Sequence, residues 1–243
     1  MSLTYASLQT SLATLTAIPT TDTNFQSVLP DAIQYSENRL YRELDLLTED
    51  VRDSSSSTSS LNRNFTLPTS IGTFQVVSGI NIITPANSVA DAGTRNPLTP
   101  VSRDVLDLIW PSSTGAAVPQ NFCYLSQSLI SGQANVLLGP WPDNVYTVEV
   151  IGKIIPTPLS ATNTTTFLSL YLPDIFLAGC MIYFCGYMKS YGAMADDPKM
   201  AQSWSNQYDQ LFQSAASWEA RKHFAGASWT SAKIEPTAQA QRG

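Results

Sequence analysis

The feature that most constrains the fold is an apolar run, YLPDIFLAGCMIYFCGYM, at residues 171–188. Behind Asp174 the run extends over 175–188 and then meets Lys189, so it is shorter than the ~20 apolar residues that a bilayer-spanning helix needs. Pro173 and Asp174 are typical of a helix start, because proline is tolerated at the first position and an acid there suits the helix dipole. A helix that is apolar on all sides is normally buried. We therefore predict a buried core helix here and no membrane anchor.

Three other segments show apolar residues at helical spacing and are the natural partners of this core helix. They cover residues 3–17, about 27–47, and 197–224, the last starting with Asp197 as cap and Pro198 at the first helical position. Its stripe consists of Met200, Trp204, Tyr208, Leu211, Phe212, Ala215 and Trp218. The side chains that we expect in the bundle core include Phe184, Trp204 and Phe212.

The middle of the chain, residues 64–167, is rich in β-branched and aromatic residues interrupted by Pro and Gly, which is typical of short strands. We predict a strand at 105–110 and an antiparallel hairpin around the GPWPDN turn at 139–144. The alternation in VYTVEV, 145–150, predicts a half-exposed strand with Glu149 on its outer face. The serine-rich run DSSSSTSS, 53–60, is of low complexity and predicts a flexible loop.

The predicted fold class is therefore α+β: an antiparallel helical bundle with an inserted β-rich region of antiparallel strands and an extended C-terminal tail. The expected organisation follows from these segments. Residues 1–52 form the N-terminal helices of the bundle, 53–63 a Ser-rich loop and 64–167 the β-rich insertion. Residues 168–225 form the C-terminal helices of the bundle, and 226–243 an extended tail.

Charge is scarce and unevenly placed. Charged residues make up 13% of the chain, about half of the ~25% that is usual for soluble domains, which suits a subunit that buries much of its surface against neighbours. The net charge of −6 argues against sequence-specific nucleic-acid binding, where a basic patch is expected. Residues 221–243 nevertheless hold four Lys or Arg residues and one Glu, so this end is suited to docking on an acidic surface or to being a solvated tail.

The sequence offers little for catalysis. It has one histidine, His223, and none of the common nucleotide-binding, zinc-protease or nucleophile-elbow motifs. Cys180 and Cys185 point about 140° apart on a helix, so we interpret them as small buried apolar residues. Three carboxylate pairs could in principle supply the two catalytic carboxyl groups of a glycosidase: Glu49/Asp50, Asp104/Asp107 and Asp196/Asp197. Turn and cap roles explain the last two better. We predict no enzyme activity, no cofactor and no metal.

Two further expectations concern location and the aromatic side chains. The first 20 residues lack the charged and apolar regions of a signal peptide, and three scattered cysteines do not suggest a disulfide framework. A reducing host cytoplasm is thus the expected place of synthesis. Trp110, Trp141 and Trp229 are either anchors of a protein interface or a platform for sugar, and the charge-poor surface favours the former.

Three segments together resemble the head-to-tail adaptor family of tailed bacteriophages, also called head-tail connectors or tail accessory factors. The segments are SVLPDAIQYSENRLYRELDLL (27–47), PWPDNVYTVEVIGKIIPTPLS (140–160) and LYLPDIFLAGCMIYFCGYMKSYGAMADDPKMAQSWSNQYDQLFQSA (170–215). Their order and separations carry the resemblance, which spans about residues 25–225. The Ser-rich run at 53–60 and Asn38, where an alanine is commoner in the family, depart from the pattern.

The resemblance implies a component of the virion neck. Such adaptors form a ring, commonly of twelve subunits, below the portal; they help to retain DNA, give the tail nozzle or tail tube an attachment surface, and leave a channel for ejection. The implied partners are other copies of the chain, the portal, the tail, and genomic DNA by passive contact. In that family the C-terminal segment often reaches the portal, which suits the basic tail here. The portal-binding candidates are Trp229, Lys233, Ile234 and Arg242.

An acidic inner wall would keep DNA phosphates from sticking in such a channel. The candidates for lining it are Asp31, Glu37, Glu43, Asp45, Glu49 and Asp50. Two alternatives stay open. One is another neck or tail ring, such as a tail terminator or stopper, and the other is a virion carbohydrate-binding module carried by the β-rich region.

Overall fold

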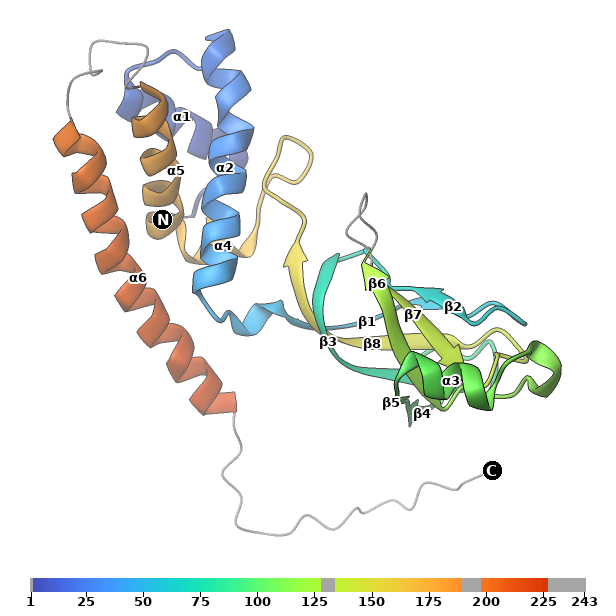
Figure 1. Ribbon diagram of the computed structural model, residues 1–243. Helices are drawn as coiled ribbons and strands as arrows, with labels where there is room; N and C mark the ends of the chain where they lie inside the picture. The colour runs from blue at the N-terminus through green and yellow to red at the C-terminus, as the bar shows by residue number, and fades with distance from the viewer. Residues whose placement is uncertain (1, 128–133, 189–197, 227–243) are drawn as a thin grey trace.

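The computed structural model describes residues 2–127, 134–188 and 198–226. It contains a helical bundle and a β region that lie at opposite ends of the molecule (Figure 1). The helices are α1 (Tyr5–Thr16), α2 (Thr23–Glu43), α3 (Arg103–Ile109), α4 (Phe167–Tyr171), α5 (Pro173–Met188) and α6 (Pro198–Gly226), with short 3₁₀ turns η1 (Leu47–Glu49) and η2 (Ser113–Gly115). The predicted α+β class is confirmed.

The central position predicted for 175–188 is confirmed as α5. Its residues Phe176, Cys180 and Phe184 are fully buried, and α5 lies against α1, α2, α4 and α6. Phe184 stacks on Phe25 of α2 with ring centroids 5.3 Å apart. Where α2 and α5 cross, a Cβ added at Gly179 would lie 2.2 Å from the Ser36 hydroxyl oxygen. The close approach of these two helices therefore depends on a glycine.

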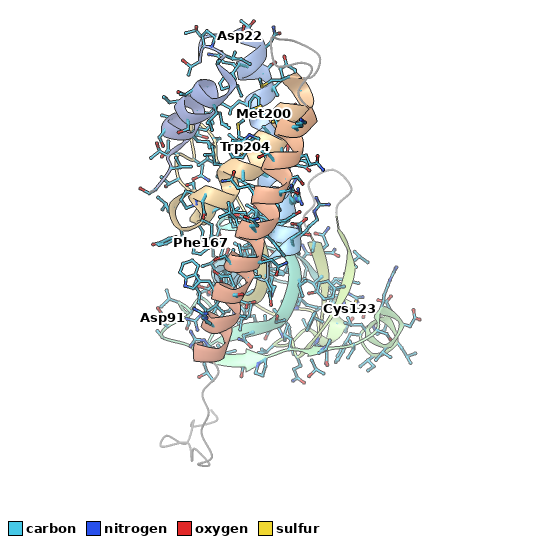
Figure 2. The ribbon with its side chains drawn as sticks, turned by 90° about the vertical axis from the view of Figure 1, so that its left-hand side faces the viewer. Asp22, Asp91, Cys123, Phe167, Met200 and Trp204 are labelled. Atoms are coloured by element: carbon cyan, nitrogen blue, oxygen red, sulfur yellow. The ribbon has the colours of Figure 1, made fainter. Side chains whose placement is uncertain are left out.

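Helix α6 packs along the bundle with one face. Figure 2 shows Met200 and Trp204 following one another along its upper half, with Phe167 of α4 lower down beside the same helix. Tyr208 is fully buried, whereas Trp204 and Phe212 are only partly buried against the bundle core. Most of the stripe thus faces the bundle as predicted, but Trp204 and Phe212 lie at the edge of the core, and Trp218 is exposed.

Helix α2 begins earlier than the sequence suggested. Residues 20–26 were expected to be a loop, yet α2 starts at Thr23, because the Asp22 carboxylate caps it by accepting a hydrogen bond from the Phe25 backbone N–H at 2.8 Å. Pro30 lies inside the helix, and α2 ends at Glu43 instead of continuing to residue 47.

The β region consists of two four-stranded sheets with a shared core. The strands are β1 (Asp50–Ser57), β2 (Asn64–Thr66), β3 (Gly72–Thr84), β4 (Thr94–Pro97), β5 (Thr99–Pro100), β6 (Asn121–Gln127), β7 (Ala134–Gly139) and β8 (Thr147–Pro156). Their orders are β1-β8-β3-β4 and β2-β7-β6-β5, all antiparallel except the short β5–β6 pair. Apolar side chains from both sheets, including Ile80, Val136 and Val148, form one buried cluster, which is separate from the bundle core.

The expected hairpin around 139–144 is wrong, because β7 and β8 belong to different sheets and this turn crosses from one sheet to the other. The strand expected at 105–110 is also wrong. These residues belong to α3, which holds Leu106 fully buried against Cys123 and Leu137. A short apolar run does not by itself distinguish a strand from a helix.

The serine-rich run does not form the predicted flexible loop over its whole length. Residues 50–57 are β1, an edge strand paired with β8. Small polar side chains suit such an edge, and here they bond locally: the Ser70 hydroxyl and the Ser55 backbone N–H both donate to the Asp53 carboxylate. The β region therefore starts at Asp50, directly after η1.

Candidate interaction surfaces

The six acids predicted to line a channel fall into two groups. Asp31, Glu43, Asp45 and Asp50 are exposed, and they run from α2 through the linker to the start of β1. Glu37 and Glu49 are 2% and 7% exposed, so they belong to the interior of the chain and do not offer a carboxylate to a channel. The sequence could have indicated the burial of Glu37, because this residue is spaced four residues from Ile33 on the buried face of α2.

The exposed acids differ in how far they are neutralised. Arg39 lies 2.9 Å from the Glu43 carboxylate, which also accepts a hydrogen bond from the Tyr208 hydroxyl at 2.8 Å. Asp45 forms an ion pair with Lys153 of β8. In the described residues no salt bridge reaches Asp31 or Asp50. These two are therefore the exposed acids of the predicted set that form no ion pair within the described residues, although the charge of Lys153 acts on Asp50.

The buried acids have unusual protonation. Glu37 accepts a hydrogen bond from the Leu159 backbone N–H at 3.1 Å, but burial raises the pKa of its carboxyl to about 7. Burial likewise raises the pKa of Glu49 to about 7, with Lys153 opposing the shift and the charges of Asp45, Asp50 and Glu219 adding to it. A pKa near 7 means that both groups change charge close to neutral pH.

Glu219 on α6 is a buried acid that the sequence analysis did not single out. It is 2% exposed, and its Oε1 accepts a hydrogen bond from the Lys222 ammonium at 2.5 Å. It lies four residues after the buried Ala215, at a position where the α6 stripe continues. That spacing could have indicated that Glu219 is buried, but a glutamate in a helix is normally assigned to the solvent side.

The predicted portal-binding residues, Trp229, Lys233, Ile234 and Arg242, lie outside the described residues, as do Asp196 and Asp197. Helix α6 extends to Gly226, as predicted, and leads directly into that segment. It runs past the end of α2 toward the level of the β region (Figure 1). The placement of the four candidates therefore remains a prediction from the sequence.

Two of the three tryptophans considered as a sugar platform, Trp110 and Trp141, pack within the chain, and Trp229 lies outside the described residues. The Trp141 indole N–H donates to the Trp110 carbonyl at 3.2 Å, and the Arg63 guanidinium lies 5.4 Å from the Trp141 ring centroid. Both rings are partly covered, and the Trp110 ring closes over Gly139. They join α3 to the sheet below it and do not form an open aromatic surface.

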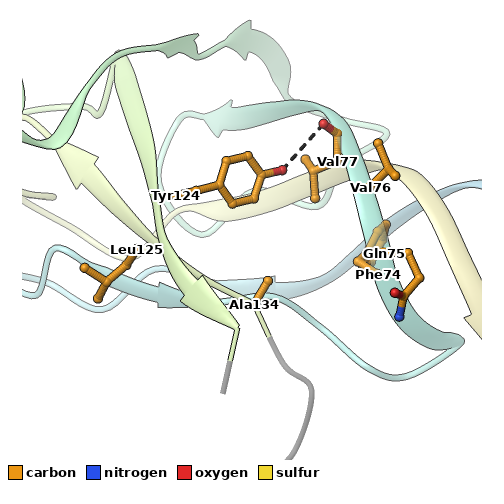
Figure 3. A pocket seen from close by; sticks show the side chains of 7 residues that line it. All are labelled: Phe74, Gln75, Val76, Val77, Tyr124, Leu125 and Ala134. Atoms are coloured by element: carbon orange, nitrogen blue, oxygen red, sulfur yellow. Dashed lines mark hydrogen bonds between the residues drawn. The ribbon is translucent and has the colours of Figure 1, made fainter. Parts of the chain in front are cut away.

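An apolar groove of about 390 Å³ lies in the β region, between β3 and β6. Figure 3 shows Tyr124 reaching across it toward Val77, where its hydroxyl donates weakly to the Val77 carbonyl at 3.5 Å. Its described lining side chains carry no charge, so they do not supply the facing carboxylates of glycoside hydrolysis.

The described residues also give no basis for a metal centre or a membrane span. Within them, no group of three or more His, Cys, Asp or Glu side chains is placed to hold a metal ion. No helix among them combines the length and apolar character needed to cross a bilayer. Burial raises the pKa of the Cys180 and Cys185 thiols, which disfavours the reactive thiolate.

Comparison with known families identifies the family of this chain. The family model described as SU10 adaptor protein matches residues 3–232, and thus includes both the bundle and the β region. The chain belongs to the SU10 adaptor protein family. No curated protein matches it.

Membership of the SU10 adaptor family confirms the resemblance to phage head-tail adaptors. It identifies a structural protein of the bacteriophage virion.

Proposed function

We propose that the protein forms a ring in the phage neck, between the portal and the tail, that joins head to tail and leaves a channel for DNA. The observation that carries this proposal is the family match over residues 3–232. A ring, commonly of twelve subunits in such adaptors, closes through repeated head-to-tail contacts between identical copies. The charge-poor composition of the chain supports extensive burial between neighbours.

The exposed acids are proposed to face the channel. Asp31, Glu43, Asp45 and Asp50 would place negative charge toward DNA phosphates and so prevent the genome from sticking. Replacing Asp31 and Asp50 by lysine should slow ejection and increase retention of DNA on isolated rings, measured by filter binding at low salt. Asp104→Lys, an exposed acid on α3, is the matched control; equal retention in both variants would count against an acidic lumen.

The segment 227–243 is proposed to dock on the portal through Trp229, Lys233, Ile234 and Arg242. A segment that becomes ordered on binding gains its affinity only at the assembled site. A chain ending at Gly226 should keep the far-UV circular dichroism and denaturation midpoint of the full chain but lose portal binding in sedimentation. Undiminished binding would contradict the docking role, and binding to tail tubes with none to the portal would favour a tail terminator.

A further inference from the structure

Helix α3 presents an exposed apolar flank at the end of the β region that lies away from the bundle (Figure 1). Val105, Leu108 and Ile109 are all exposed, and Leu108, at 82%, is the most exposed large apolar residue of the described chain. Their spacing of three and four residues makes them neighbours on one side of the helix. A contiguous apolar surface in water, unlike scattered apolar side chains, marks an interaction site.

The other contacts of α3 hold this flank in its outward position. Leu106 is buried against the sheet below the helix. On the opposite flank Arg103 lies 3.4 Å from the Asp107 carboxylate, which also pairs with Arg63 at 2.8 Å. Helix α3 is thus fixed on its own β region by one apolar side chain and by charged ones. Its apolar flank can be covered only by something outside this chain's β region.

The apolar groove between β3 and β6 is a concave surface of matching character. Its described lining residues carry no charge, and Val76, Tyr124 and Leu125 among them are exposed. Figure 3 shows Val76 on the β3 side and the other two on the β6 side. Strand β3 lies on the bundle side of the β region, whereas α3 lies at the opposite end (Figure 1). The groove and the apolar flank of one chain therefore do not cover each other.

We propose that the apolar flank of α3 in one copy docks into the groove between β3 and β6 of the next copy, with Leu108 entering the groove. The convex and the concave surface belong to different parts of one chain, so this contact is heterologous and repeats from copy to copy. One kind of contact then covers both apolar surfaces of every copy. A foreign protein bound to either surface would leave the other exposed, which is why a second copy is the better occupant.

The size of the two surfaces indicates a weak contact between any single pair of copies. Three apolar residues of α3 meet seven lining residues of the groove, against about 20–30 residues a side in an interface of standard size. Copies held side by side on a portal would meet at a raised effective concentration, which strengthens weak contacts. This role as a lateral contact of the ring rests on the proposed function. The contact itself joins two copies and is testable without portal.

Disulfide trapping of the full chain tests the contact. Leu108→Cys and Val76→Cys are prepared separately in a Cys185→Ser background, because Cys185 is half-buried whereas the other two cysteines are buried. After mild oxidation, an equimolar mixture should give about tenfold more disulfide-linked dimer than either variant alone, since docking brings the two thiols together. Peptide mass spectrometry should join position 108 of one copy to position 76 of another. Asp104→Cys, on the charged side of α3, mixed with Val76→Cys is the matched control and should give no such increase.

Two trapping results would overturn the contact. They are a mixture that gives no more dimer than the Asp104→Cys control, and a higher yield from Leu108→Cys alone, which would mean that two α3 helices meet symmetrically.

Ring formation on the portal separates this contact from the ring proposal. Leu108→Asp changes an exposed residue, so it should keep the circular dichroism of the unmodified chain but lose closed rings in native mass spectrometry. Closure by Leu108→Asp equal to that of the unmodified chain would leave the ring standing, assign the α3 flank to another partner and overturn the contact. A trapped dimer joining positions 108 and 76, with no ring on the portal from the unmodified chain, would support the contact and contradict the ring.

Discussion

The bundle and the β region both bury glutamates, but they treat the charge differently. In the β region, Glu149 is 1% exposed and accepts hydrogen bonds from Asn81 at 2.9 Å and Arg95 at 3.1 Å, with Arg52 3.5 Å away. In the bundle, Glu37 is just as buried, yet no salt bridge reaches it within the described chain, and the hydrogen bond that it accepts comes from the Leu159 backbone N–H. The β region thus pairs its buried acid, whereas the bundle holds one whose charge is disfavoured.

Because the two halves surround their buried acids differently, pH and salt should act on them in different ways. Two arginines lie against Glu149, whereas Glu37, in an apolar setting, binds a proton near neutrality. The halves also have separate apolar cores, so a change in one core should leave the other largely intact. The following predictions test this contrast.

The largest effect is expected from the bundle core. Phe184→Ala should lower the free energy of unfolding of the bundle by about 3–5 kcal/mol, since it removes a fully buried ring and leaves a cavity. Phe212→Ala, at the partly exposed edge, should cost less. Hydrogen exchange during urea denaturation reports on the unfolding of each half separately. A loss of protection in β8 equal to that in the bundle would show that the cores are not independent.

A comparable effect is expected from pH through Glu37. Its folded pKa of about 7 lies above the ordinary 4.5, so the native state binds more protons between these values and loses stability as pH rises from 4.5 to 7. Glu37→Gln should therefore stabilise the bundle at pH 8, by up to about 3 kcal/mol, and change little at pH 4.5. Thermal unfolding at both pH values measures this, and an equal shift at both would contradict it.

The crossing of α2 and α5 provides a matched pair of glycines in one helix. Gly179→Ala should destabilise by about 1–3 kcal/mol, because its Cβ would overlap the Ser36 hydroxyl. Gly186→Ala meets nothing within 4 Å and should stabilise the helix by about 0.5–1 kcal/mol. Urea midpoints of the two variants should move in opposite directions; a common direction would mean that the helices do not cross this closely.

The paired acid of the β region should respond in the opposite direction to Glu37. Glu149→Gln should destabilise by about 1–2 kcal/mol through weaker bonds to Arg95 and Arg52. Arg103→Ala, which removes an exposed helical ion pair with Asp107, should cost less than about 0.5 kcal/mol. Stabilisation by Glu149→Gln, as expected for Glu37→Gln, would remove the contrast between the two halves.

The helices were more predictable than the strands for a physical reason. Helical periodicity is local, so the spacing along α5 and α6 revealed which elements form the bundle. Strand partners are chosen over long separations: β8 pairs with β1 and β3, and nothing between residues 139 and 147 reveals that β7 lies in the other sheet. Edge strands such as β1 also need few apolar residues, which is why the Ser-rich run resembled a loop.

The candidate surfaces were predictable in kind but not in detail. Acidic residues along α2 and the linker were recognisable, but the sequence does not state which carboxylates are buried. Glu149 shows this most clearly, because alternation in 145–150 placed it on a solvent face that Arg52 and Arg95 in fact cover. Burial of a charge depends on partners from other strands, and these are set by the fold.

Native mass spectrometry of the purified protein with and without its portal shows whether the chain closes into a ring on the portal. One closed stoichiometry of this chain is expected on each portal ring, whatever its state alone. Free monomers and unmodified portal rings at every mixing ratio would contradict it.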